Sequence, residues 1–542
     1  MSADDRPSLI APTEPVLPMG DIQGIVVPGF TKPHETLLGV QFGAGSQVTK
    51  NFKQFLRELS KEIATADETL KDRRNHREVR RAAKTRYPTN APQSVFVAVA
   101  FSYVGLRKLT LGAGAISSDA FRQGMGARSA ILGDPESGDG SPQKWDVGGP
   151  GKEVDALFVV AGDSRTAVST RADDLKKSLE GFGTNVVYRE DGDIRDDLKG
   201  HEHFGFDDGV SQPGIRGRAS DAPSDFITDR HISSSRIPET YLYGYPGQDL
   251  IWPGVLVLGH PAASPDPLVP GIPSPAIPDW TRNGSFLVFR RLVQDVGLFW
   301  RTVRELAGDL SQQPGFEEIT DDKLASRLVD RWPSGAPVNR VPAADDNALG
   351  KCSEANNHFR FDSDSAKLPL QQGFNDTFSM SKADPAGVIC PWAAHIRKVN
   401  TRDSSSDMGG REATYARRIL RVGIPFGPPL AAERRYSDQN EDKDYVKRGL
   451  LFQCVQASIE DQFEFLTTRW MNDPARPKMP GGHDVLLGQN NAIGEDRQRR
   501  CTVFGSALQQ AEIRTPAQWV IPTGGGYFFV PSVSALRDVL GN

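Results

Sequence analysis

SFLVFRRL, residues 285–292, opens the stretch of sequence that decides the fold. Its β-branched and aromatic residues predict a strand. A helix follows, and then come two further strand-like segments, RRILRVGI (417–424) and GLLFQCVQ (449–456). A second helix precedes a last strand, YFFVPS (527–532), so the order is β-α-β-β-α-β. The apolar residues that mark the two helices by their spacing are Val296, Phe299, Trp300, Val303 and Leu306, and then Ile459, Phe463, Leu466 and Trp470.

The first half of the chain repeats this order. Its strand-like segments are LLGVQF (37–42), SVFVAVAF (94–101), DALFVV (155–160) and TNVVYR (184–189). One helix lies between the first two strands and another between the last two. Their apolar positions are Phe52, Phe55, Leu56, Leu59 and Ile63, and then Leu175, Leu179 and Phe182. This is the order of a ferredoxin-like unit, an antiparallel sheet with helices on one face.

Two such units predict an α+β fold in which two antiparallel sheets face each other. A cavity between the sheets would suit a flat cofactor. We divide the chain into a flexible N-terminal arm (1–20), an N-terminal ferredoxin-like half (21–215) and a C-terminal half (216–542). The C-terminal half contains loop insertions, among them the Pro-rich segment 260–280.

The composition is that of an ordinary globular protein and excludes several partners. The 542 residues have a formal net charge of −5, which implies no basic face for nucleic acid. No apolar run approaches the ~20 residues of a membrane span, and the acidic, Pro-rich start lacks the features of a secretory signal. We therefore expect a cytoplasmic protein. Removal of a secretory signal before this numbering began stays open as an alternative. The four cysteines form no CxxC pair, which predicts reduced thiols.

The bend HFGFDDGVSQPG (203–214) is unusual because it combines two adjacent carboxylates with two aromatic rings. Turns ordinarily use one Asp for local hydrogen bonding. The second carboxylate is therefore a candidate for chemistry, and the rings of Phe204 and Phe206 are expected to pack against the core or a cofactor.

Two later segments each contain a further candidate. His395, in VICPWAAHIRKVNTR (388–402), lies where an apolar stretch meets a basic one. It suits either a core histidine or an axial metal ligand beside an anion-binding surface. Arg421 lies in YARRILRVGIPFGPP (415–429). The alternation of side chains along this strand directs Arg421 to the inner face of the sheet, where it needs a counter-charge such as Asp208. The alternative for Arg421 is a surface ion pair at a strand edge.

Together, Asp208, Arg421 and His395 predict haem peroxide chemistry. His395 would bind the iron, and Asp208 would move a proton of hydrogen peroxide from the near oxygen to the far one. Arg421 would stabilise the negative charge that develops as the O–O bond breaks. Arg402 would pair with a haem propionate.

At this point the sequence resembles a known family, the dye-decolorising peroxidases. GFDDG (205–209) resembles the family's GxxDG motif, AHIRKVNTR (394–402) the segment with the proximal His and a propionate-binding Arg, and ILRVGIPFG (419–427) the segment with the distal Arg. The family's residues map to Asp208, His395, Arg402 and Arg421, and the resemblance implies that Arg421 contacts the haem as well as serving in catalysis. The stretch 448–465 is similar to the family's apolar distal wall, to which Leu450 and Phe452 map.

The resemblance extends over nearly the whole chain, and the loop insertions are similar to those of the larger subgroup of the family. It implies two ferredoxin-like units around one haem b per chain, hydrogen peroxide as oxidant, and aromatic dyes or phenols as reductants. The chain departs from the family pattern in two places. Gly423 stands where some members have Asn, and Thr401 stands where the family often has Pro.

Three alternatives stay open. A haem-binding or iron-handling protein would have weak peroxidase activity. A non-haem metalloenzyme would use the alternate pair His201 and His203 with Asp208. A structural scaffold would hold no cofactor. Bulky reductants would give electrons at a surface tryptophan or tyrosine, and the sequence does not choose among its eight tryptophans. The physiological reductant and the oligomeric state are also left open.

Overall fold

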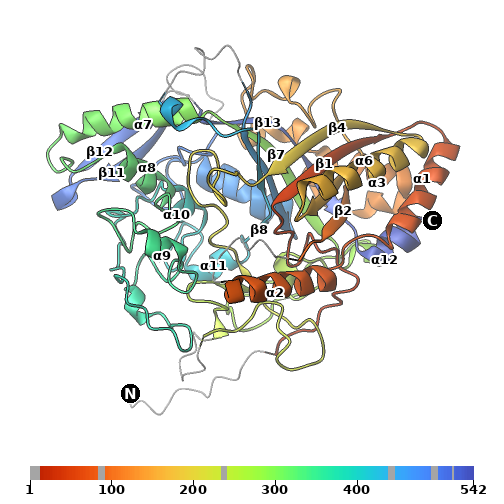
Figure 1. The fold of residues 1–542 in the computed structure, drawn as a ribbon, viewed down its shortest axis with the longest axis horizontal. Helices are drawn as coiled ribbons and strands as arrows, with labels where there is room; N and C mark the ends of the chain where they lie inside the picture. Colours follow the sequence, from red (N-terminus) through yellow and green to blue (C-terminus); the bar gives the residue numbers. More distant parts are fainter. Residues whose placement is uncertain (1–12, 84–91, 233–240, 437–445, 490–497, 516–517) are drawn as a thin grey trace.

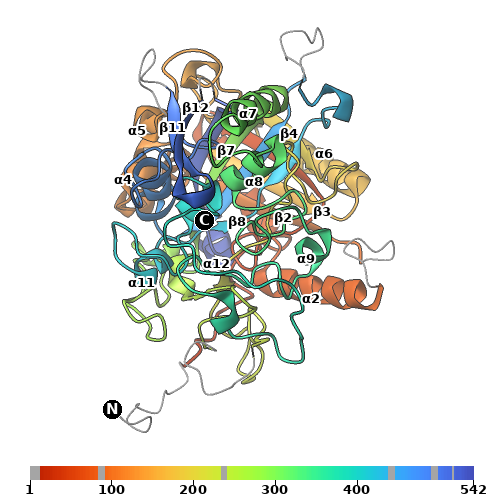
Figure 2. The same ribbon diagram turned by 90° about the vertical axis from the view of Figure 1, so that its left-hand side faces the viewer.

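The computed structural model describes residues 13–83, 92–232, 241–436, 446–489, 498–515 and 518–542. Figure 1 shows the first half of the chain on the right and the second half, with its many short segments, on the left. In the turned view of Figure 2, α7 (Val296–Ser311) and the hairpin of β11 (Arg499–Phe504) and β12 (Gln510–Thr515) come to the front.

The N-terminal unit is an antiparallel sheet with helices on its outer face. Its strands are β1 (His34–Phe42), β2 (Val95–Phe101), β3 (Ala156–Gly162) and β4 (Thr184–Asp193), in the spatial order β4-β1-β3-β2. The expected helices are α1 (Ser46–Leu59) and α6 (Arg165–Gly181). Further helices are α2 (Ala66–Ala83), α3 (Tyr103–Leu109), α4 (Asp119–Gln123) and α5 (Ser129–Leu132).

The C-terminal unit repeats the strand order. Its elements are β7 (Ser285–Gln294), α7, β8 (Leu420–Arg421), β9 (Ile424–Phe426), β10 (Gly449–Gln456) and β13 (Val520–Val530), arranged as β13-β7-β10-β8, with β9 also paired to β10. The strand predicted over 417–424 is broken into β8 and β9. The helix predicted after β10 is present but is wound as π-helix over Ile459–Glu464 and Leu466–Met471.

The two units form one nine-stranded sheet. It is joined where β2 pairs with β13 at a single residue pair, Phe101 and Phe529. At the opposite side β4 packs against β9, because Gly192 has no side chain: a Cβ atom there would lie 2.4 Å from Ile424. The predicted α+β fold of two ferredoxin-like units with antiparallel sheets is confirmed.

Apolar side chains fill the space between the two halves of the sheet. This inner core contains Leu37, Val159, Leu287, Phe289, Leu451 and Val455, contributed by strands of both units. The alternate residues of the same strands face the helices. The space between the sheets is therefore core, and room for a flat cofactor has to lie on an outer face of the sheet.

Inserted segments of the C-terminal half cover that unit's outer face. Between α7 and β8 the chain forms α8 (Asp321–Val329), α9 (Asn347–Lys351), α10 (His395–Val399) and α11 (Arg411–Tyr415). Between the two units, residues 194–284 form a long connection that includes the parallel pair β5 (Gly214–Ile215) and β6 (Leu250–Ile251). The short helix α12 (Val533–Ala535) continues as π-helix over Leu536–Leu540.

The predicted N-terminal arm needs one correction. Residues 1–12 lie outside the described residues, but the part from residue 13 onward is packed against the protein. Leu17 and Met19 are buried, and the amide of Leu17 donates to the carbonyl of Arg218. All four cysteines are free thiols, as predicted. Among the described helices, none is long and apolar enough to cross a membrane.

Candidate active site

The bend at 203–209 is held by a buried carboxylate. Glu202 accepts hydrogen bonds from the amides of Phe204 and Phe206, both at 2.8 Å. Burial raises the pKa of Glu202, although these hydrogen bonds act in the opposite direction. The two rings of the bend are buried, Phe204 against Phe299 and Phe206 against Trp300. The hydrogen bonds to Glu202 and the packing of the two rings therefore fix the backbone of the bend.

The bend brings Asp208 to Arg421, as expected. Nη1 of Arg421 lies 3.3 Å from Oδ1 of Asp208, although the two residues are 213 positions apart. The same oxygen accepts the amide of Gly209 at 2.6 Å, where a positive φ of 75° suits glycine. Nη2 of Arg421 donates to the carbonyl of Ser211 at 3.0 Å. About a third of each side chain stays exposed, so the pair is open to a small reactant.

Arg421 shares a sheet face with the two apolar residues predicted for the distal wall. The register pairs Arg421 with Cys454, and paired residues point to the same side of a sheet. Leu450 and Phe452 alternate with Cys454 along β10 and so point to that side too. Both are only partly buried, and Phe452 packs beside the cluster that covers this outer face.

Asp208 and Arg421 open into a polar cavity of about 310 Å³. Glu35 and Lys32 of the N-terminal unit line its other wall. Glu35 is buried and accepts a hydrogen bond from Gln453, and burial raises its pKa to about 8. A cavity of this size and polarity suits a small polar molecule.

His395 is the first residue of α10, and a buried carboxylate fixes its ring. Nδ1 of His395 lies 2.7 Å from Oδ2 of Asp484. Burial acts to raise the pKa of Asp484, but His395 and the amides of Leu486 and Leu487 outweigh it and hold the pKa below its ordinary value. With Nδ1 engaged, Nε2 is the ring atom left to bind a metal, the arrangement that orients metal-binding histidines in proteins.

Asp484 was missed by the sequence analysis. It lies 89 positions after His395, in the unremarkable segment GGHDVLL (481–487). No spacing or motif links the two residues, and only the fold brings them together.

Arg402 lies at the other end of the same segment, in a buried cluster that is short of negative charge. It has a positive φ of 51°. Its Nη2 donates to Oδ1 of Asn357 at 2.6 Å, and Nη2 of Arg331 donates to the same oxygen at 3.2 Å. Burial lowers the pKa of Arg331 to about 9 and that of Arg402 to about 10. Two buried guanidiniums on one neutral oxygen favour a bound carboxylate.

Arg331 is affected by the charges of other site residues. Burial lowers the pKa of its guanidinium most, and the charges of Arg402 and, more weakly, Arg421 lower it further. The sequence analysis did not single out Arg331. Its only local signal is an ordinary Asp-Arg-Trp triplet at the end of α8.

His201 and His203 do not form a metal pair. Nε2 of His201 lies 3.0 Å from the carbonyl of Pro333, whereas Nε2 of His203 lies 2.9 Å from the carbonyl of Phe426. His201 lines the cavity of Asp208, and His203 lines a different one. The segment is not a strand, so the alternation expected for the two rings does not apply.

Comparisons with known proteins identify the family of the chain. Residues 21–196 match the family model described as the DyP dimeric alpha+beta barrel domain. The chain is 31% identical over 450 residues to dye-decolorizing peroxidase msp1 of Mycetinis scorodonius, covering 82% of this chain and 76% of that protein. It is 30% identical to multifunctional dye peroxidase DyP2 of Amycolatopsis sp., covering 79% of each.

A solved structure of an ancestral D-type dye decolorizing peroxidase superposes with a TM-score of 0.73. The two are 32% identical, and the match covers 97% of this chain and 99% of that one. The fold, the paired acid and guanidinium, and a histidine oriented for metal binding are features of a peroxidase. The chain belongs to the dye-decolorising peroxidase family, whose members are haem-dependent enzymes.

The residues of this chain fit such a cofactor. The Asp484–His395 pair leaves Nε2 for iron. Among the described residues Arg331 and Arg402 donate hydrogen bonds to neutral oxygens, and Nε of Arg402 is buried without a hydrogen-bond partner. A porphyrin supplies carboxylates for such a cluster and a flat apolar ring for Leu450 and Phe452.

Proposed function

We propose that this peroxidase reduces hydrogen peroxide and oxidises aromatic dyes and phenols by one-electron steps. The observation that carries the proposal is the contact between Asp208 and Arg421 in a small polar cavity. Relatives named as dye-decolorizing peroxidases support the dye substrates. A related structure, 26% identical with a TM-score of 0.68, is a complex with 2,6-dimethoxyphenol, which supports the phenols.

Each residue then has a defined role. Bound haem would supply the redox-active iron for the two-electron reduction of peroxide. His395 would hold the iron through Nε2, with Asp484 fixing the ring. Asp208 would take a proton from one peroxide oxygen and return it to the other. Arg421 would donate to the oxygen on which negative charge develops.

The remaining residues would position the cofactor. We infer one non-covalent haem b per chain, since the chain has no CxxCH sequence for covalent attachment. Arg402 and Arg331 would bind its propionates, and Leu450 and Phe452 would cover the face that peroxide approaches. Extraction of the haem with acidified solvent, followed by its quantification against protein, tests both the type and the stoichiometry.

The test of the catalytic proposal compares the two adjacent acids of the bend. Asp208→Asn keeps the size of the side chain but removes the acid–base group, so the reaction with peroxide should slow by about 10²- to 10⁴-fold. Asp207→Asn is the matched control. Its side chain lies against Gly335 and is not among the residues that line the cavity of Asp208.

Stopped-flow absorbance of the haem-loaded enzyme after mixing with peroxide gives the rate directly. Slowing in Asp208→Asn, with Asp207→Asn close to the wild type, supports the assignment. Equal rates in wild type and Asp208→Asn would remove Asp208 from the mechanism.

A further inference from the structure

A second cavity among the described residues lies on the other side of the bend. It has a volume of about 660 Å³, a size typical of small-molecule sites. His201, Glu202 and Asp208 line the small polar cavity, whereas the intervening His203, Phe204 and Gly205 line the large one. One short loop therefore separates the two cavities.

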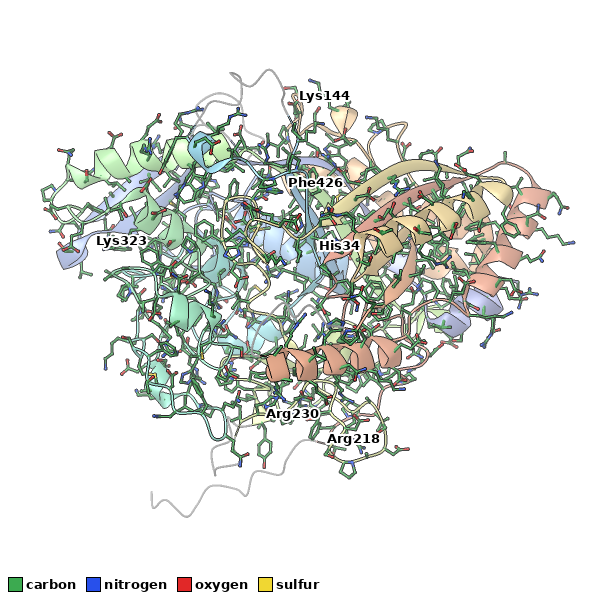
Figure 3. The ribbon with its side chains drawn as sticks, viewed as in Figure 1. His34, Lys144, Arg218, Arg230, Lys323 and Phe426 are labelled. Carbon is green, nitrogen blue, oxygen red and sulfur yellow. The ribbon has the colours of Figure 1, made fainter. Side chains whose placement is uncertain are left out.

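The walls of this second cavity are aromatic and apolar. Trp300 of α7, Phe204 and Trp332 contribute rings, and Leu430 and the alanines at 431–432 contribute apolar surface. α8 contributes Asp322 to the rim, and in Figure 3 its neighbour Lys323 lies at the outer edge of the C-terminal unit. An aromatic ring is the ligand that such walls recognise.

The charges of the cavity oppose an anionic ligand. Arg435 is paired with Asp322 at 2.6 Å and Arg195 with Asp197 at 2.7 Å, and Asp345 adds a further carboxylate. Burial lowers the pKa of His203 to about 4, so its ring is neutral at pH 7. Two guanidiniums against three carboxylates leave a slight negative excess, which favours an uncharged ring over a sulfonated one.

Trp300 connects the cavity to the active site. Its indole Nε1 donates to the carbonyl of Phe204 at 3.1 Å. Its ring is nearly parallel to that of Phe206, with 6.3 Å between centroids and 11° between planes. Phe206 precedes Asp208 by two residues, and Phe452 packs against the same apolar cluster as Trp300. Arg435 also lines the cavity, and its guanidinium lies 3.3 Å from the centroid of the Trp300 ring.

We propose that this second cavity binds an uncharged phenol and that Trp300 carries its electron to the active site. The proposal rests on the peroxidase function proposed above, which supplies the oxidant. Trp300 loses one electron to the peroxide-oxidised centre and regains it from the phenol, whose proton goes to water. Two phenols are oxidised for each peroxide, giving two phenoxyl radicals and two waters.

Two variants test the proposal in the haem-loaded enzyme. Ala344→Trp fills the cavity from an exposed position and should leave the fold intact. Trp300→Phe removes the oxidisable indole but keeps an aromatic ring. Each should lower kcat/KM for 2,6-dimethoxyphenol by at least about tenfold, while the stopped-flow rate of Ala344→Trp with peroxide stays at the wild-type value.

Trp519→Phe is the matched control for Trp300→Phe. Trp519 belongs to the same apolar cluster, with its ring 5.1 Å from that of Phe299, but it is not among the residues that line the cavity. A sulfonated azo dye serves as the anionic donor and should be oxidised equally by wild type and Ala344→Trp. Thermal melting checks the fold of every variant.

The outcomes separate the two proposals. Phenol turnover that is unchanged in a folded Ala344→Trp or Trp300→Phe variant overturns the cavity assignment. An equal loss for the phenol and the sulfonated dye overturns its preference for uncharged donors. A wild-type enzyme that reacts with peroxide but oxidises neither donor overturns the proposed function itself.

Discussion

The third strands of the two units occupy equivalent places in the same strand order, yet their outer faces differ. In the N-terminal unit the outward residues of β3, Ala156, Phe158 and Val160, are completely buried against helices. In the C-terminal unit the outward residues Leu450 and Phe452 of β10 are only partly buried. The two copies of the fold therefore differ in how well their central strands are covered. The C-terminal copy leaves part of β10 uncovered, and two of the candidate site residues lie there.

The largest effect should come from His395, the proposed iron ligand. His395→Ala removes the only metal-binding atom we assign, so the purified protein should lack haem absorbance and peroxidase activity. His201→Ala is the control, since it removes the histidine that the non-haem alternative requires. Visible spectra after haem loading decide between them: a haem band retained by His395→Ala and lost by His201→Ala would contradict the assignment.

Arg421→Leu should give the next largest effect. The variant loses the donor to the developing negative charge, so kcat/KM for peroxide should fall by about 10²- to 10³-fold. Haem absorbance should persist, because His395 and Arg402 would still hold the cofactor when Arg421 is replaced. Steady-state kinetics at varied peroxide concentration measure the loss, and a rate near that of the wild type would count against the role.

A pair of phenylalanines tests the comparison of the two faces directly. Phe158→Ala empties a sealed core position and should lower the free energy of unfolding by about 3–5 kcal/mol. Its rate per haem should not change. Phe452→Ala should cost less stability, because its side chain is only partly buried, and should weaken haem binding instead. Urea unfolding and haem titration measure the two properties, and an identical pattern for both variants would refute the distinction.

Glu35→Gln should have the smallest effect, and it depends on pH. Unfolded Glu35 ionises near pH 4.5, whereas the folded carboxyl does so only near pH 8. The folded protein therefore keeps a proton that the unfolded chain releases, and stability present below pH 4.5 is lost as the pH rises toward 8. The loss is on the order of a few kcal/mol. Urea unfolding at pH 5 and pH 8 should show a smaller fall in Glu35→Gln, and equal falls would contradict it.

The sequence predicted the fold because its signals are local and repeated. Periodic apolar residues marked β7, α7 and β10, and the repeated order identified both units. The same pattern could not show that Val422 and Gly423 would interrupt a strand, or that the space between the sheets would be filled. Those outcomes depend on how side chains of both units pack together.

The site was predictable only where a motif marked it. Asp208 and Arg421 are in contact as predicted, whereas the roles of His395, Arg402, Leu450 and Phe452 stay predictions. Asp484 escaped notice because its contact with His395 joins segments 89 positions apart, and Arg331 because no motif marks its hydrogen bond to Asn357. The second cavity could not be predicted from the sequence either, since its walls come from several separate stretches between residues 195 and 435.

The inner core shared by the two units has a consequence for how the protein denatures. Among the described strands, β2 and β13 pair at the single residue pair Phe101 and Phe529, but both units contribute side chains to one packed interior. Neither half alone could exclude water from that interior. Calorimetry should therefore record a single endotherm, in which both halves melt together as one cooperative block.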